Sequence, residues 1–252
     1  MRKSSLIAVM AALALSPAAL ADDVADTLQR FVADYAADPS VTEAQSFGIL
    51  VGEDWYTVTA SPGRASLREG QPGEPTFYFV TDAETVARID ASEINALTGM
   101  AKAFSSDFAP MDIGMMEGFT PDQDFVGPLL ATSFHFWTRG QPEAIPFGRG
   151  MTRVTHGTNG GIFFYQPGFR SGFFHIEPGH HVNADERSQT NPFPSLFVVT
   201  EGWAYGRING IEMRIEAGNA YFVPAGHAHE FWLPEDADTD AFGFLFMFGE
   251  GA

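Results

Sequence analysis

Short aromatic segments, separated every few residues by glycine, proline or asparagine, dominate the second half of the chain and constrain its fold more than any other feature. Segments of this length and composition favour strands, and no helical periodicity intervenes between them. The sequence therefore predicts an all-β jelly roll or barrel over residues 129–252. The expected strands are Ser133–Thr138, Gly161–Tyr165, Gly172–Ile176, Leu196–Thr200, Trp203–Ile208, Ile211–Ile215, Ala220–Val223 and Phe242–Phe248.

The segment from Gly218 to His229 has a pattern with a direct mechanical meaning. Gly218 turns the chain into a strand, Pro224 ends the donation of hydrogen bonds to the strand ladder, and Gly226 permits a tight turn. This turn is expected to direct His229 into the barrel. The spacing of these four residues resembles the second motif of the cupin superfamily, and the resemblance implies a cupin-like barrel with His229 in its pocket.

Upstream, Phe174–Gly179 and Phe197–Gly202 resemble the frame of the first cupin motif. In that family the first motif supplies two histidines and a glutamate, which bind a metal ion together with the histidine of the second motif. Here the two histidine positions are held by Gln189 and Asn191, and the glutamate position by Ser195. Amides and a hydroxyl are weak ligands for a transition metal, so the sequence departs from the metal-binding pattern.

Two hypotheses for the pocket remain open. In the first, His229 with His180, His181 and the nearby carboxylate of Glu186 holds one divalent ion of iron, manganese, nickel or zinc, as in a cupin lyase, isomerase or oxygenase. In the second, the pocket binds a small apolar or aromatic organic ligand without a metal, and the histidine pair lies on the surface. The missing first-motif ligands favour the second hypothesis. The expected pocket residues are Gln189, Asn191, Ser195, His227 at the rim, Tyr205, Phe174 and Trp232, whereas His135 and His156 are expected to have structural roles.

The first half of the chain predicts a small α+β domain over 22–117, followed by a linker at 118–128 where proline and glycine interrupt the apolar periodicity. A helix is expected at Val24–Tyr35, then strands, then two short helices between Thr81 and Phe104. The expected strands are Phe47–Val51, Trp55–Thr59 and Thr76–Val80. This order resembles the sterol-carrier-protein-like fold, with a loose match at Gly52-Glu53-Asp54-Trp55. The resemblance implies a lipid or acyl chain between sheet and helices, and a fully packed core is the alternative.

The first residues have the order of a secretory signal: the basic Arg2 and Lys3, an apolar run from Leu6 to Leu15, and the small-residue site Ala19-Leu20-Ala21. Cleavage after Ala21 would export the chain to the periplasm. No later stretch is long and apolar enough to span a membrane.

The charge of the chain argues against polyanionic partners. It has 14 basic and 32 acidic residues, a formal net charge of −18, and no cysteine. Nucleic acid and anionic lipid surfaces are therefore disfavoured. Aromatic residues on both faces of several expected strands predict contact with the first domain or pairing with a second copy in a homodimer.

Overall fold

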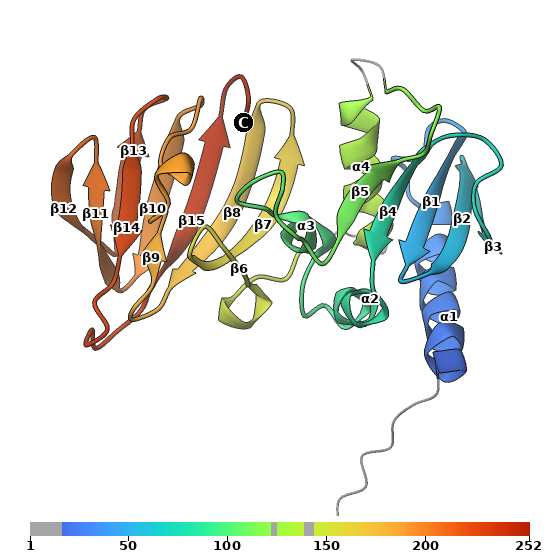
Figure 1. Ribbon diagram of the computed structural model, residues 1–252, viewed down its shortest axis with the longest axis horizontal. Coiled ribbons are helices and arrows are strands. Elements are labelled where there is room, and N and C mark those ends of the chain that lie inside the picture. Colours follow the sequence, from blue (N-terminus) through green and yellow to red (C-terminus); the bar gives the residue numbers. More distant parts are fainter. Residues whose placement is uncertain (1–16, 122–124, 139–143) are drawn as a thin grey trace, which may run out of the picture.

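The computed structural model describes residues 17–121, 125–138 and 144–252 (Figure 1). Most of the predicted signal segment, residues 1–16, lies outside the described residues. The described chain divides into two groups of strands with helices gathered around the first group (Figure 1). No helix among the described residues is both long enough and apolar enough to cross a membrane.

The first group is a five-stranded sheet with the order β3-β2-β1-β4-β5, in which only β1 and β4 pair in parallel. Its elements are α1 (Pro17–Ala36), β1 (Gln45–Val51), β2 (Asp54–Ser61), β3 (Arg64–Glu69), β4 (Phe77–Thr81), α2 (Ala83–Asp90), α3 (Ala96–Met100), β5 (Asp112–Met115) and α4 (Val126–Trp137). The predicted first helix, three strands and two short helices are confirmed. The strands β3 and β5 escaped prediction because β3 is a mostly polar edge strand and β5 has no alternating apolar pattern.

Aromatic side chains fill the space between this sheet and its helices. Phe31 and Tyr35 of α1 are buried, as are Phe47 of β1 and Phe79 of β4. Tyr35 and Phe47 pack edge to face, with ring centroids 6.4 Å apart. This packing lends no support to an acyl chain between sheet and helices, which stays a prediction.

The strand predicted at Ser133–Thr138 is wrong, because these residues form the end of the helix α4 and its cap. Aromatic density suggested a strand there, but Leu130, Phe134 and Trp137 recur at helical spacing and are all buried. Phe136 and Trp137 belong to the core of the first sheet. That core therefore extends past the predicted linker at 118–128.

The second group consists of two facing sheets, one of six strands with the order β13-β10-β15-β8-β7-β6 and one of four with the order β12-β11-β14-β9. Its elements are η1 (Arg149–Met151), β6 (Arg153–Thr155), β7 (Thr158–Gln166), β8 (Phe169–Ile176), β9 (His181–Val182), η2 (Glu186–Ser188), β10 (Ser195–Glu201), β11 (Trp203–Ile208), β12 (Ile211–Glu216), β13 (Asn219–Val223), β14 (His229–Trp232) and β15 (Ala241–Phe248). Seven of the eight predicted strands are confirmed. Both sheets contribute to one apolar core, so the group is a β-barrel of the jelly-roll kind.

Period-two alternation decides which side chains enter the barrel. On β10, Ser195, Phe197 and Val199 are buried, whereas their neighbours Leu196 and Val198 are only half-buried on the outer face. The same alternation on β11 and β14 turns their largest side chains outward, which matters for the predicted pocket.

The helix α3 lies between the two groups (Figure 1). Asn95, the N-cap of α3, donates from its side-chain amide to the carbonyl of Ile162 on β7 at 2.8 Å. The backbone amide of Ile162 donates in return to the hydroxyl of Thr98 at 2.8 Å. These two bonds hold α3 against β7, the strand next to the edge of the six-stranded sheet.

Candidate ligand-binding site

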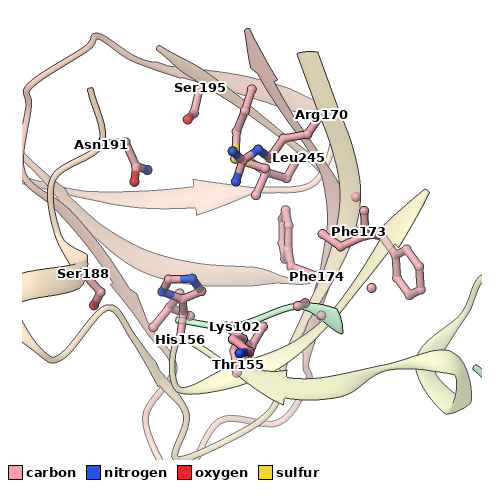
Figure 2. Close-up of a pocket in the computed structure, with 18 of the residues that line it drawn as sticks. Lys102, Thr155, His156, Arg170, Phe173, Phe174, Ser188, Asn191, Ser195 and Leu245 are labelled. Atoms are coloured by element: carbon pink, nitrogen blue, oxygen red, sulfur yellow. The ribbon is translucent and has the colours of Figure 1, made fainter. Parts of the chain in front are cut away.

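A cavity of about 760 Å³ occupies the barrel interior and continues to α3 and β5 (Figure 2). Its size lies in the range of ordinary small-molecule sites. Apolar side chains form most of the wall, among them Phe174, Phe197, Phe231, Leu245 and Met247. The polar lining groups are Lys102, Ser105, Asp112, Thr155, His156, Thr158, Arg170, Asn183, Ser188, Asn191, Ser195 and His229.

His229 lines this cavity, as the turn before it predicts, and is only 2% exposed. Gly226 adopts a left-handed backbone at φ +74°, and its amide donates to the carbonyl of Asn191 at 2.8 Å. The backbone amide of His229 donates to the carbonyl of Gln189 at 2.9 Å. These bonds fix the turn against the 189–191 loop, and β14 then begins at His229 with its side chain inward.

The His229 ring has a defined hydrogen-bonding role. Its Nδ1 lies 3.2 Å from the carbonyl oxygen of His227, so this nitrogen is the donor in the neutral ring. Burial lowers the pKa of His229, the carbonyl of His227 opposes this shift, and nearby His156 adds to it. The ring is therefore neutral near pH 7 and has Nε2 available as an acceptor.

His156 is a second cavity histidine that the sequence interpretation missed, because it stands alone beside glycine and matches no motif. Its backbone is left-handed at φ +54°, and its ring is drawn inside the cavity in Figure 2. Burial lowers its pKa, although a charge on Asp107 and a bond to Asn183 favour the protonated form. Nδ1 is buried and has no partner among the described residues. The His-Gly pair, which is typical of a tight turn, was the one signal in the sequence.

Arg170 of β8 is the cation of the opposite wall, and its guanidinium points into the cavity (Figure 2). The group lies over the rings of Tyr165 and Phe193, at 4.6 and 5.1 Å from the ring centroids. Its Nη2 donates to the carbonyl of Gly251 at 3.2 Å and to the hydroxyl of Tyr165 at 3.5 Å. Its Nε is buried without a partner in the described chain.

Three of the predicted pocket residues, Phe174, Asn191 and Ser195, line the cavity. Gln189 contributes only its backbone to the turn before His229, while its side chain donates to the carbonyl of Asn183 at 3.0 Å. His227 is not among the lining residues; its Nδ1 lies 3.2 Å from the carbonyl oxygen of Ala225.

The predicted placement of Tyr205 and Trp232 in the pocket is wrong. Their rings pack on each other on the outer face of the four-stranded sheet, with centroids 5.8 Å apart. Strand alternation explains the error, because Ala204, Gly206 and Phe231 take the inward positions. Aromatic character alone could not decide between the two faces.

The proposed metal ligands do not converge on His229. His181 is exposed and its Nε2 lies 2.6 Å from a carboxylate oxygen of Glu230, because Val182 takes the inward position of β9. His180 Nδ1 accepts from the amide of Glu177 at 3.2 Å. Glu186 is exposed on η2. Of the four, only His229 lines the cavity.

The fit to a metal ion is therefore poor. In the part of the chain that the structure describes, no group of three or more histidine, aspartate or glutamate side chains has the arrangement needed to hold one. The cavity histidines instead combine with amides and hydroxyls, which are weak transition-metal ligands. The residues present do not fit the metal centre that the resemblance implied.

No family model matches the chain, and no curated protein matches it. Solved structures similar to part of it include a cupin 2 conserved barrel domain protein from Salinispora arenicola, at 17% identity over 42% of this chain and 88% of that one, with a TM-score of 0.36. A predicted oxalate decarboxylase from Thermotoga maritima has 14% identity over 36% and 79% of the two chains, with a TM-score of 0.32. The DMSP lyase DddQ from Ruegeria pomeroyi has 17% identity over 34% and 41%, with a TM-score of 0.28. We draw neither family nor activity from likenesses at this level.

Proposed function

We propose that the chain is an exported protein with a cupin-like barrel, which binds a small organic ligand with an apolar or aromatic body in the cavity around His229. The observation that supports this most is the cavity itself, at about 760 Å³ with a mainly apolar wall and a few inward polar groups. Such a combination buries the body of a ligand and orients it through a small number of hydrogen bonds.

Two features support binding over metal-dependent turnover. The first-motif positions are Gln189, Asn191 and Ser195, and the alternative ligands His180, His181 and Glu186 do not line the cavity with His229. The neutral ring of His229 is suited to accept a hydrogen bond from a ligand hydroxyl or amine. Export rests on the basic, apolar and small-residue order of residues 1–21.

The test is to purify the full chain gently from its expression host, extract it with organic solvent, and analyse the extract by mass spectrometry alongside the metal content. We expect a small organic compound to co-purify with the wild type and to be depleted in His229→Leu, while His227→Leu outside the cavity retains it. Stoichiometric iron, manganese, nickel or zinc that vanishes in His229→Leu would overturn the proposal in favour of a metal enzyme.

A further inference from the structure

The charges of the cavity wall do not balance. Its two cations are Lys102 and Arg170, and its one carboxylate among the described lining residues is Asp112. Lys102 forms an ion pair with Asp112, so these two charges cancel. Arg170 forms no ion pair with any described carboxylate, although the whole chain has a net charge of −18.

The guanidinium of Arg170 is held rigidly. Tyr165 and Phe193 lie against it, and Gly251 accepts from Nη2. The other donors are less well satisfied: Nε has no partner, and no hydrogen bond from Nη1 is found in the described chain. Arg170 is half-buried as a whole, and its buried Nε is a donor that an anionic ligand in the cavity would satisfy. The fork of an arginine matches a carboxylate in particular.

Polar groups accompany Arg170 at this end of the cavity, and Phe174 separates it from His156. Asn191 and Ser195 lie toward the same end as the guanidinium in Figure 2, and Phe174 lies between that end and His156. The side chains of Asn191 and Ser195 add donors that a carboxylate accepts from. The cavity therefore has an anion-accepting end and an apolar middle.

We propose that the ligand is an organic acid, whose carboxylate pairs with Arg170 while its apolar body lies against Phe174 and Leu245. This inference rests on the proposed function and specifies the chemical class of its ligand. The alternative is a purely structural role, in which Arg170 only packs Tyr165 and Phe193 together. The two differ in what they predict for an acid and a neutral compound of the same shape.

The experiment titrates the purified full chain by calorimetry with 3-phenylpropanoate and with its uncharged amide, 3-phenylpropanamide. We expect the wild type to bind the acid about 10-fold to 100-fold more tightly than the amide, the range for a charge-assisted hydrogen bond. In Arg170→Met the preference should vanish, with acid affinity falling to that of the amide. Arg170→Lys should keep a reduced preference, since it retains the charge without the fork.

The matched control is Arg214→Met. Arg214 is exposed, lies outside the cavity, and stacks 4.2 Å from the centroid of the Trp203 ring. It should leave the acid preference unchanged. Equal binding of acid and amide by the wild type would overturn the organic-acid inference and leave the proposed function standing. Binding of neither compound would overturn both. The comparison of acid and amide binding by the wild type tests the inference even if Arg170→Met fails to fold.

Discussion

Asn183 connects the two cavity histidines: its backbone amide donates to the carbonyl of His156 at 2.9 Å, and its side-chain amide donates to the carbonyl of His229 at 3.4 Å. The backbones of the two histidines are thus tied to one residue, although no sequence motif links His156 with His229. Asn183 itself has a left-handed backbone at φ +56°. Asn183 therefore helps to fix the placement of His156 relative to His229.

The lowered pKa values of His156 and His229 predict a loss of stability in mild acid. Between the lowered folded pKa and the unfolded value near 6.5, the unfolded chain binds protons that the folded chain does not. The free energy of unfolding therefore rises with pH in this window and falls as the pH drops from about 7 toward 5. His229→Gln should lose less stability over this interval than the wild type, as measured by urea titrations at both pH values. The control is His227→Gln, which should lose as much stability as the wild type. An equal loss of stability in His229→Gln and the wild type would contradict a lowered pKa at His229.

Gly157 keeps His156 at the cavity by allowing β9 to approach. A Cβ at Gly157 would lie 2.2 Å from the carbonyl oxygen of His181, whereas one at Gly210 would meet nothing within 4 Å. Both glycines have a left-handed backbone, at φ +81° and +79°. We expect Gly210→Ala to cost about 1 kcal/mol for backbone strain alone, and Gly157→Ala about 2–4 kcal/mol because the clash is added. Urea unfolding of the two variants measures the difference. Equal costs would show that β9 yields without penalty.

The junction between α3 and β7 should depend on the side-chain amide of Asn95. Asn95→Asp keeps the oxygen that accepts from Thr98 in the α3 cap but loses the donor to the carbonyl of Ile162. We expect a destabilisation of about 1–2 kcal/mol and faster hydrogen exchange at the Ile162 amide. The control is Asp82→Asn at the cap of α2, which accepts from Thr85 and makes no such contact with the barrel. If the Ile162 amide of Asn95→Asp exchanged at the same rate as in the wild type, α3 would not be anchored to β7 through this bond.

The sequence predicted the barrel and the position of His229 because both rest on local rules. Strand length and turn residues are visible in a single chain, and the Pro224 to Gly226 turn determines the direction of the residues after it. The face of a strand on which a side chain lies was harder to predict from the sequence. Tyr205 and Trp232 are as apolar as their inward neighbours, so only the pairing register places them outside.

Two other features, the helix α4 and the position of His156, were not predicted because they depend on contacts made in the folded chain. The residues of α4 have aromatic content typical of strands, yet their spacing lets Phe136 and Trp137 complete the first core. His156 reaches the cavity through the hairpin in which β6 pairs with β7, with Thr155 opposite Thr158. A hairpin is a local feature, but its sequence does not say that a side chain in the turn faces the cavity.

A neutral fluorescent probe, 2-naphthol, shows whether the barrel cavity binds a small organic ligand, as we propose. Ser195 and Met247 face each other on neighbouring strands and both line the cavity, so Ser195→Phe with Met247→Trp fills it. Leu196 and Phe246, the next pair in the same register, lie outside the cavity lining, so Leu196→Phe with Phe246→Trp is the matched control. In fluorescence titrations we predict single-site binding to the wild type and to the control, and its loss in the filled variant. Undiminished binding by a folded filled variant, or no binding by the wild type, would contradict the claim.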